Sequence, residues 1–158
     1  MAGSLIHVAK SRPEASGPAD PPARNLPSQK PAAPTSRLAQ FNITELSLRL
    51  DSLMHEERLF CDEDLSLETL AGYMGLRRHQ LSELIRTVHN TNFYGYINGL
   101  RIQCAREMLI AEPDRSILSI ALAAGFNSKS TFNAEFRKRT NLTPGQFRQE
   151  NMMANTSL

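Results

Sequence analysis

Apolar residues recur at intervals of three and four positions from residue 43 onwards. The pattern begins with Ile43, Leu46, Leu50 and Leu53, and this spacing is typical of an amphipathic helix that turns one face to a core. We expect this first helix over residues 41–60, and further helices at about 67–74, 77–88, 93–110, 117–124, 129–139 and 144–151. No alternation of apolar and polar residues is long enough to predict a strand. The sequence therefore predicts an all-α fold.

Residues that start and stop helices stand at the ends of these segments. Three helical runs are preceded by a serine that can act as N-cap: Ser66, Ser116 and Ser128. Thr143 followed by Pro144 supplies an N-cap and a proline at the first helical position. Pro113 falls after the long segment 93–110, where it interrupts no helix. These residues support the predicted boundaries.

The first 40 residues follow a different pattern. Seven of the nine prolines lie before residue 37, with few large apolar residues among them. Such a segment cannot bury enough apolar surface to offset the entropy lost on ordering. We expect residues 1–40 to form a disordered, proline-rich arm or linker, followed by a helical domain at 41–150 and a tail at 152–158.

The small net charge of the chain conceals a basic core. Lys and Arg number 18 and Asp and Glu number 16, which gives a formal charge of +2. Residues 1–64 carry 7 basic and 9 acidic side chains, a net charge of −2, whereas residues 65–148 carry 11 basic and 6 acidic ones, a net charge of +5. The total alone does not indicate a nucleic-acid ligand. The partition places the positive charge on the helical core.

Composition excludes several classes of protein. Two cysteines, Cys61 and Cys104, cannot build a disulfide framework or a cysteine-rich zinc site. No apolar run approaches the roughly 20 residues that span a bilayer, and Leu5–Ala9 is too short for the core of a signal peptide. The four histidines show no spacing typical of a metal site or a catalytic nucleophile. We expect a soluble cytoplasmic protein that is not an enzyme and uses neither metal nor cofactor.

The helical core contains an internal repeat. One pattern of apolar residues, alanine and glycine occurs twice, 50 residues apart: Leu67, Leu70, Ala71, Met74 and Gly75, then Ile117, Ile120, Ala121, Ala124 and Gly125. After the glycine the offset is 51, with the pairs Leu81–Phe132 and Ile85–Phe136. The alanine lets two helices cross closely, and the glycine permits the positive φ of a tight turn. The repeat predicts two helix-turn-helix units, at 65–90 and 116–140, each with a second helix that can enter a DNA major groove. A bundle of helical hairpins without nucleic acid is the alternative interpretation.

Several short motifs of the second unit are specific. They are Ile120-Ala121, Gly125-Phe126, Ser130-x-Phe132, Phe136-Arg137 and Thr143-Pro144-x-x-Phe147-Arg148, and the segment before them contains Arg101, Ala105 and Leu109 at intervals of four. Together they resemble the signature of the AraC-type (AraC/XylS) transcription regulators over roughly residues 45–150. The resemblance implies two helix-turn-helix subdomains joined by one long linker helix at 93–110, with a C-terminal helix at 144–151.

Some residues depart from that family pattern. Asn141 stands where the family usually has glycine, but asparagine can adopt the left-handed conformation, so the turn should survive. Gly95 and Gly99 lie inside the linker helix, where each costs up to about 1 kcal/mol relative to alanine. The segments 92–102 and 125–133 most resemble a branch whose DNA-binding domain follows a membrane-embedded sensor, and this sequence contains no such sensor. Whether the chain is complete or the C-terminal part of a longer regulator stays open.

The two recognition helices suggest which side chains read DNA. We expect base contacts from Arg78, His79, Ser82, Lys129, Ser130 and Asn133, since Arg can bind guanine O6 and N7 and Asn can bind adenine N6 and N7. His79 could equally be a solvated surface residue. We expect phosphate contacts from Arg77, Arg86, Ser128, Arg137, Lys138 and Arg139. The inward stripes should be Leu81, Leu84, Ile85 and Val88, and Phe132 and Phe136.

We therefore expect a sequence-specific, double-stranded DNA-binding transcription regulator that inserts two recognition helices into successive major grooves. The alternative is a truncated or sensor-less regulator fragment that acts mainly as a protein-interaction module. The expected partner is promoter DNA in the cytoplasm, at the nucleoid, bound by a monomer or weak dimer. The acidic end of the first helix, with Glu56, Glu57, Asp62, Glu63 and Asp64, could contact a second copy or RNA polymerase, but packing under the first unit is the favoured role of that helix.

Overall fold

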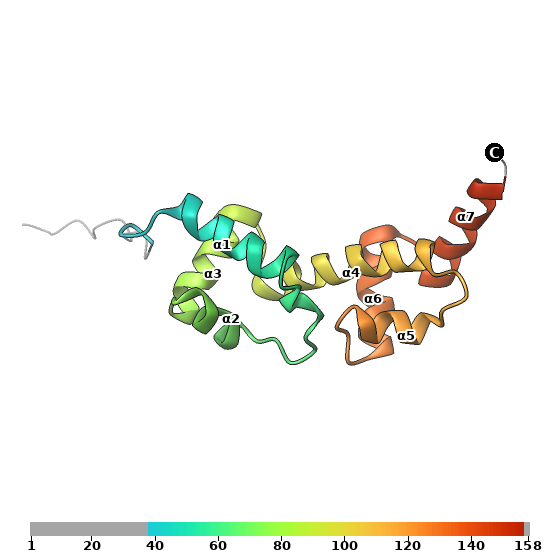
Figure 1. Ribbon diagram of the computed structural model, residues 1–158, viewed down its shortest axis with the longest axis horizontal. Helices are drawn as coiled ribbons and strands as arrows, with labels where there is room; N and C mark the ends of the chain where they lie inside the picture. Colours follow the sequence, from blue (N-terminus) through green and yellow to red (C-terminus); the bar gives the residue numbers. More distant parts are fainter. Residues whose placement is uncertain (1–37, 157–158) are drawn as a thin grey trace, which may run out of the picture. The chain divides into compact units, whose positions relative to one another are not determined.

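The computed structural model describes residues 38–156 of the chain. Within that range it contains seven α-helices, one short 3₁₀ helix and no strand (Figure 1). The predicted all-α class is therefore confirmed. Most of the predicted proline-rich arm lies outside the described residues. Its last positions, 38–40, form a turn, and Leu38 is buried in the core.

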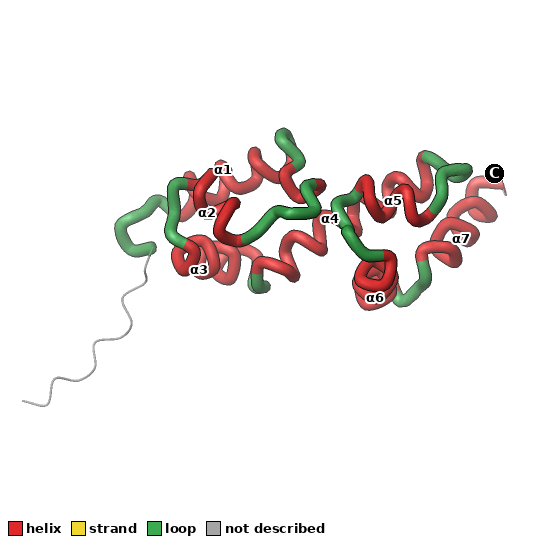
Figure 2. The backbone as a smooth tube through the Cα atoms, turned by 90° about the horizontal axis from the view of Figure 1, so that it is seen from below, coloured by secondary structure: helices red, strands yellow, loops and turns green. Residues whose placement is uncertain are grey.

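The helices follow one another in two groups that share a long central helix. The first group comprises α1 (Ile43–His55), the 3₁₀ helix η1 (Leu59–Cys61), α2 (Leu67–Met74) and α3 (Arg78–His89). The central helix is α4 (Phe93–Ala111), and the second group comprises α5 (Ile117–Ala123), α6 (Lys129–Thr140) and α7 (Pro144–Thr156). Figure 2 shows the two groups on either side of α4. Most predicted helix ends agree within one residue, and α7 extends five residues further.

The expectation of a single first helix over 41–60 is wrong at its C-terminal end. Helix α1 stops at His55, and Arg58 adopts a left-handed conformation with φ 53°. The chain then turns into η1, where the Cys61 amide donates to the Arg58 carbonyl at 2.9 Å. Apolar residues on both sides of this break kept the amphipathic spacing, so periodicity alone did not reveal it.

Side-chain caps define the start of most of these helices. Each predicted N-cap accepts a hydrogen bond from a backbone amide three residues later: Ser66 from Thr69, Ser116 from Ser119, Ser128 from Thr131, and Thr143 from Gln146. Asn92 caps α4 in the same way, with its Oδ1 2.8 Å from the amide of Gly95. Because caps satisfy amides that lack a partner within the helix, they set the register of each helix.

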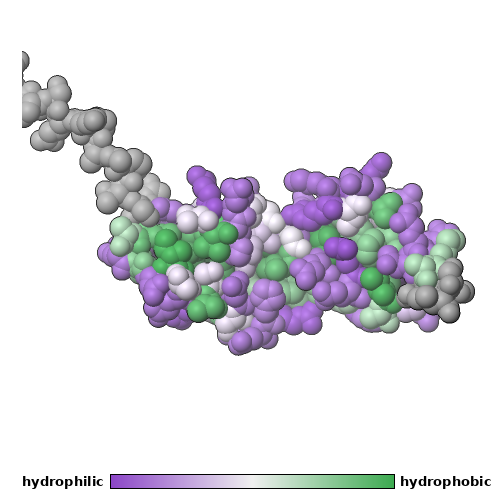
Figure 3. Space-filling view, turned by 90° about the horizontal axis from the view of Figure 1, so that it is seen from above, coloured by the Kyte–Doolittle hydropathy of each residue, from purple (hydrophilic) through white to green (hydrophobic). Residues whose placement is uncertain are grey.

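Two hydrophobic cores divide the structure, and α4 contributes to both. Its first half places Phe93, Tyr96 and Ile97 in the core of the first group. Its second half places Ile102, Ala105 and Leu109 in the core of the second group. Hydrophilic side chains cover most of the face drawn in Figure 3, with hydrophobic patches between them.

The internal repeat is visible in the burial of its members. The paired residues Leu81 and Phe132 are both fully buried, as are Ile85 and Phe136. Gly75 and Gly125 both have positive φ, 66° and 92°. Val88 is the exception in the predicted stripe, with 37% of its surface exposed. The last turn of α3 instead turns His89 inward, and its ring stacks on Tyr96 with 4.2 Å between ring centroids.

Phe132 lets the second core be tested. It is fully buried and contacts the rings of Phe126 and Phe136. We expect Phe132→Ala to lower the free energy of unfolding by about 3–5 kcal/mol in urea denaturation, because it leaves a cavity. Leu122→Ala is the control, since Leu122 is 51% exposed and such surface changes stay within about 0.5 kcal/mol. Similar losses from both variants would contradict the assigned core.

Candidate nucleic-acid interface

The two helix-turn-helix units are built alike. In the first, α2 ends at the left-handed Gly75, and the Leu76 amide donates to the Ala71 carbonyl at 2.9 Å. In the second, Gly125 takes the same place, and the Phe126 amide donates to the Ala121 carbonyl at 3.0 Å. These hydrogen bonds close the helix end around a residue with positive φ. At each turn the chain changes direction, so that α3 follows α2, and α6 follows α5, along a different axis.

Helix α3 presents most of its predicted DNA-reading residues to solvent. Arg77, Arg78, His79 and Arg86 are exposed, and Ser82 is half-buried. The start of the helix is ordered by Gln80, whose Oε1 accepts from the Arg77 amide at 2.9 Å. Arg78 lies 3.8 Å from Glu68 of α2, but both side chains are largely exposed, and such pairs contribute little stability. This ion pair therefore does little to fix the Arg78 side chain.

Helix α6 brings its predicted residues together along a groove. Lys129, Asn133 and Arg137 line one side of a depression of about 840 Å³. Its other walls come from the starts of α5 and α7, at Ser116 and Thr143. Backbone amides and N-cap hydroxyls at helix N-termini are suited to contact phosphate oxygens.

The predicted serines of α6 lie at its first turn. Ser128 and Ser130 are joined through their hydroxyl oxygens at 2.7 Å. Ser128 is the N-cap of the helix, and Ser130 is exposed. Both hydroxyls therefore lie at the end of α6 where its first amides are found.

Sequence reasoning did not include Ser116, Thr143 and Arg148 among the DNA-facing residues, although all three line the groove. The N-cap position of Ser116 was the available signal, because the first helix of a helix-turn-helix crosses the DNA backbone. For Thr143 the only signal was its N-cap hydroxyl. Arg148 could not be placed from sequence, since its position depends on the contact between α7 and the loop before α5.

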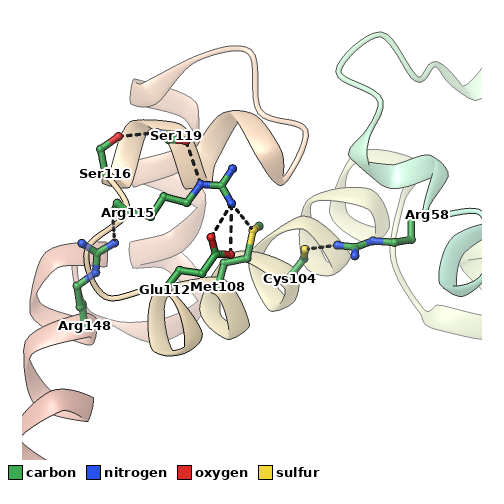
Figure 4. Close-up of polar contacts among 8 residues, drawn as sticks. All are labelled: Arg58, Cys104, Met108, Glu112, Arg115, Ser116, Ser119 and Arg148. Atoms are coloured by element: carbon green, nitrogen blue, oxygen red, sulfur yellow. Dashed lines mark hydrogen bonds and ion pairs between the residues drawn. The ribbon is translucent and has the colours of Figure 1, made fainter.

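Arg115 holds that loop in place (Figure 4). Its guanidinium donates to Ser119 Oγ at 3.0 Å and pairs with Glu112 at 3.1 Å. Arg148 then donates to the Arg115 carbonyl at 2.7 Å. The end of α4, the start of α5 and helix α7 are thus joined through one residue, which sets the wall of the groove.

Arg139 does not lie with the exposed basic residues. It is half-buried, forms an ion pair with Glu135, and donates to the Gly95 carbonyl of α4 at 2.9 Å. Arg137 and Lys138, by contrast, are exposed. A phosphate contact from Arg139 would have to break both interactions, so its position does not favour the predicted phosphate contact.

Burial shifts the pKa of three groups on α4. It lowers the pKa of Arg101, which is half-buried. It raises the pKa of the Cys104 thiol, an effect that the nearby Arg58 guanidinium opposes. It also raises the pKa of the Tyr96 phenol. All three lie where α4 packs against its neighbours.

Residues 38–156 contain neither a metal-binding cluster nor a membrane-spanning helix. No group of three or more His, Cys, Asp or Glu side chains in this range is placed to hold a metal ion. Within the same range, no helix has the length and apolar character needed to cross a membrane.

Comparison with known proteins gives consistent matches. The family described as "Helix-turn-helix domain" matches residues 70–150. The probable transcription factor PqrA of Proteus vulgaris is 33% identical over 101 residues, which cover 64% of this chain and 82% of PqrA. The melibiose operon regulatory protein of Escherichia coli strain K12 is 33% identical over 88 residues, 56% of this chain but only 29% of that protein. The chain therefore spans less than a third of that longer regulator.

Solved structures share the fold. A transcriptional regulator from Chromobacterium violaceum, described as having an AraC-type DNA-binding domain, aligns with a TM-score of 0.60 and 31% identity, over 68% of this chain and 93% of that one. The DNA-binding domain of AdpA, solved in complex with a target DNA, aligns with a TM-score of 0.57 over 68% of this chain and 90% of that one. Because only 20% of the aligned residues are identical, this likeness shows that the two proteins share a fold and nothing more.

The different surroundings of Arg137 and Arg139 can be tested by comparing the stability of the two alanine variants. We expect Arg139→Ala to lower the free energy of unfolding by about 1–2 kcal/mol, because the Gly95 carbonyl and Glu135 lose a charged donor. Arg137→Ala, two residues away on the same helix and exposed, should change it by less than about 0.5 kcal/mol. Urea denaturation followed by circular dichroism measures both values. Equal values would contradict the structural role of Arg139.

Proposed function

Because this chain belongs to the AraC-type family of helix-turn-helix transcription regulators, we propose that it inserts α3 and α6 into two successive major grooves of one duplex. It is a sequence-specific DNA-binding regulator, and the members of its family are not enzymes. The proposal concerns how the DNA is held and which residues read it.

One observation carries this proposal: the same helix-turn-helix occurs twice, and one continuous helix joins the copies. Each copy has a glycine turn with positive φ, a buried stripe and an outer face rich in Arg, Lys, Ser or Asn. A recognition helix presents the residues of its first turns to base edges. Two such helices on one chain are suited to an extended site rather than a single groove.

The base-reading role falls to exposed or half-buried residues of the two helices: Arg78, His79 and Ser82 on α3, and Lys129, Ser130 and Asn133 on α6. Arginine and asparagine form paired hydrogen bonds with guanine and adenine, and each such pair contributes about 1–3 kcal/mol of discrimination. Of these residues, Lys129 and Asn133 also line the groove beside α6.

The phosphate-binding role falls to residues around these helices. On the first unit they are Arg77 and Arg86, and on the second they are Ser128, Arg137 and Lys138. We add the N-caps Ser116 and Thr143, which face the same groove as Arg137. Contacts of this kind supply affinity and register without reading sequence.

Further partners follow from the family and are proposed on that ground. We propose that the regulator acts in the cytoplasm, at the nucleoid, as a monomer or weak dimer. An exposed acidic stretch between α1 and α2, which contains Asp62, Glu63 and Asp64, is our proposed contact for RNA polymerase. Leu50 and Met54 of α1 are fully buried, so α1 itself is a structural part of the first core.

The test begins with selection of a binding site from a randomised duplex pool, followed by mobility-shift titrations at several salt concentrations. We expect Arg78→Ala and Asn133→Ala to change the preferred base at one position each. Arg137→Ala should weaken binding to all sequences alike and reduce the log–log salt slope by about one unit, because one phosphate contact is lost.

The matched control for charge is Arg106→Ala. Arg106 is exposed on α4, outside both helix-turn-helix units, and its guanidinium lies over the ring of Phe147, away from the proposed DNA contacts. Its loss should therefore change neither the preferred sequence nor the salt slope. Equal effects from Arg78→Ala, Asn133→Ala and Arg137→Ala would refute the assignment of roles. Binding that shows no sequence preference after selection would favour the protein-interaction module instead.

A further inference from the structure

The two groups of helices meet at the backbone of residues 60–62, which form the end of η1 and the residue after it, just before the first helix-turn-helix unit. Here the carbonyls of Phe60 and Asp62 both accept from Arg101 of α4, at 2.7 Å each. Its guanidinium also lies over the ring of Phe126, 5.7 Å from the centroid. Phe126 belongs to the second core, so Arg101 contacts both units at once.

Gly125, the turn glycine of the second unit, approaches the same backbone. A Cβ atom at this position would lie 2.6 Å from the Phe60 carbonyl oxygen and 2.8 Å from that of Cys61. Gly75, its counterpart in the first unit, also has positive φ, yet a Cβ there would meet no atom within 4 Å. Positive φ explains both glycines, but only Gly125 is also required by close packing.

The η1 turn around residues 58–62 is held by a second arginine as well. Arg58 donates to the Cys104 sulfur at 2.9 Å, and its guanidinium lies 5.8 Å from the centroid of the Phe60 ring. Figure 4 shows Arg58 reaching towards Cys104 on α4. Because Arg58 and Arg101 both tie this turn to α4, the surface that receives Gly125 has little freedom to move.

A second contact joins α6 to the start of α4. Arg139 donates to the Gly95 carbonyl at 2.9 Å while it pairs with Glu135. Charge-assisted hydrogen bonds of this kind are stronger and more directional than neutral ones. The recognition helix α6 is therefore attached both through its preceding turn and through its own last turns.

We propose that the contact of Phe60, Cys61, Asp62 and Arg101 with Gly125 and Phe126, the inter-unit joint, makes the spacing between two DNA half-sites a determinant of specificity. The proposal rests on the proposed function and adds a positioning role for Arg101 and Gly125, which contact no base. The joint holds α3 and α6 at one separation and one angle, so the protein selects DNA whose half-sites match that geometry.

The physical reason is the geometry of the duplex. One inserted base pair moves the second half-site by about 3.4 Å along the helix and rotates it by about 35° around the axis. If the joint cannot follow, the DNA has to bend or twist, and that deformation weakens binding. If the joint is loosened, the protein can adjust instead.

The experiment compares the selected site with versions that have one base pair inserted or removed between the half-sites. We define the spacing penalty as the dissociation constant for an altered site divided by that for the selected site, both measured in mobility-shift titrations. We expect a penalty of about tenfold or more for the wild-type chain. Arg101→Ala and Gly125→Ala should each lower it to about threefold or less.

Two control variants separate the joint from general effects. Gly75→Ala imposes the same kind of left-handed strain without a clash, and Arg106→Ala removes an exposed arginine from the same helix as Arg101. Both should keep the wild-type penalty. Circular dichroism and thermal unfolding establish that each variant is folded, and Arg101→Lys replaces Arg101→Ala if the latter is not. In Arg101→Lys, a single ammonium group cannot donate to the Phe60 and Asp62 carbonyls with the geometry of the guanidinium. We therefore expect this variant to have a spacing penalty between those of the wild type and Arg101→Ala.

The outcomes are distinct. A spacing penalty that stays at the wild-type value in the folded Arg101 and Gly125 variants would overturn the joint, because a merely structural role lowers affinity for every spacing alike. A wild-type chain that tolerates the inserted base pair without loss of affinity would overturn it as well. Absence of any sequence preference in the wild type would instead refute the proposed function.

Discussion

The placement of both recognition helices depends first on one constraint, that α4, a single helix of 19 residues, contributes side chains to two hydrophobic cores. Phe93 and Ile97 anchor the helix in the first group, and Ala105 and Leu109 anchor it in the second. Residues on a continuous helix keep a set rise and rotation relative to one another. Burial of apolar surface at both ends therefore converts two small cores into one scaffold that presents α3 and α6 together.

The two units share a backbone plan but not their surroundings. Gly75 and Gly125 are equivalent in sequence and conformation, yet only Gly125 abuts the backbone of the other unit. Differences of this kind fix the orientation of one helix-turn-helix relative to the other, which two identical copies alone would not do. Specificity then has two physical sources, which are side chains that contact bases and a joint that sets where those side chains stand.

Much of this was predictable from local patterns. Helical spacing, N-cap residues such as Ser66 and Ser116, and the glycine turns are decided by neighbours in sequence, and the structure confirms them. Other features, like the position of Arg148, were not predictable. The break at Arg58, the exposure of Val88 and the inward course of Arg139 each depend on packing between segments far apart in the chain. Among the basic residues of α6, sequence alone could not distinguish Arg139 from Arg137, because both follow the same helical pattern and only the fold brings Gly95 beside one of them.

The central claim is that two recognition helices contact one duplex at once. A hydroxyl-radical footprint of the wild-type chain on its selected site tests it most directly, since it maps the protected backbone nucleotide by nucleotide. Two helices in successive major grooves should protect patches on one face of the duplex, with centres about 10–10.5 base pairs apart. A single protected patch, unchanged at saturating protein, would contradict the account.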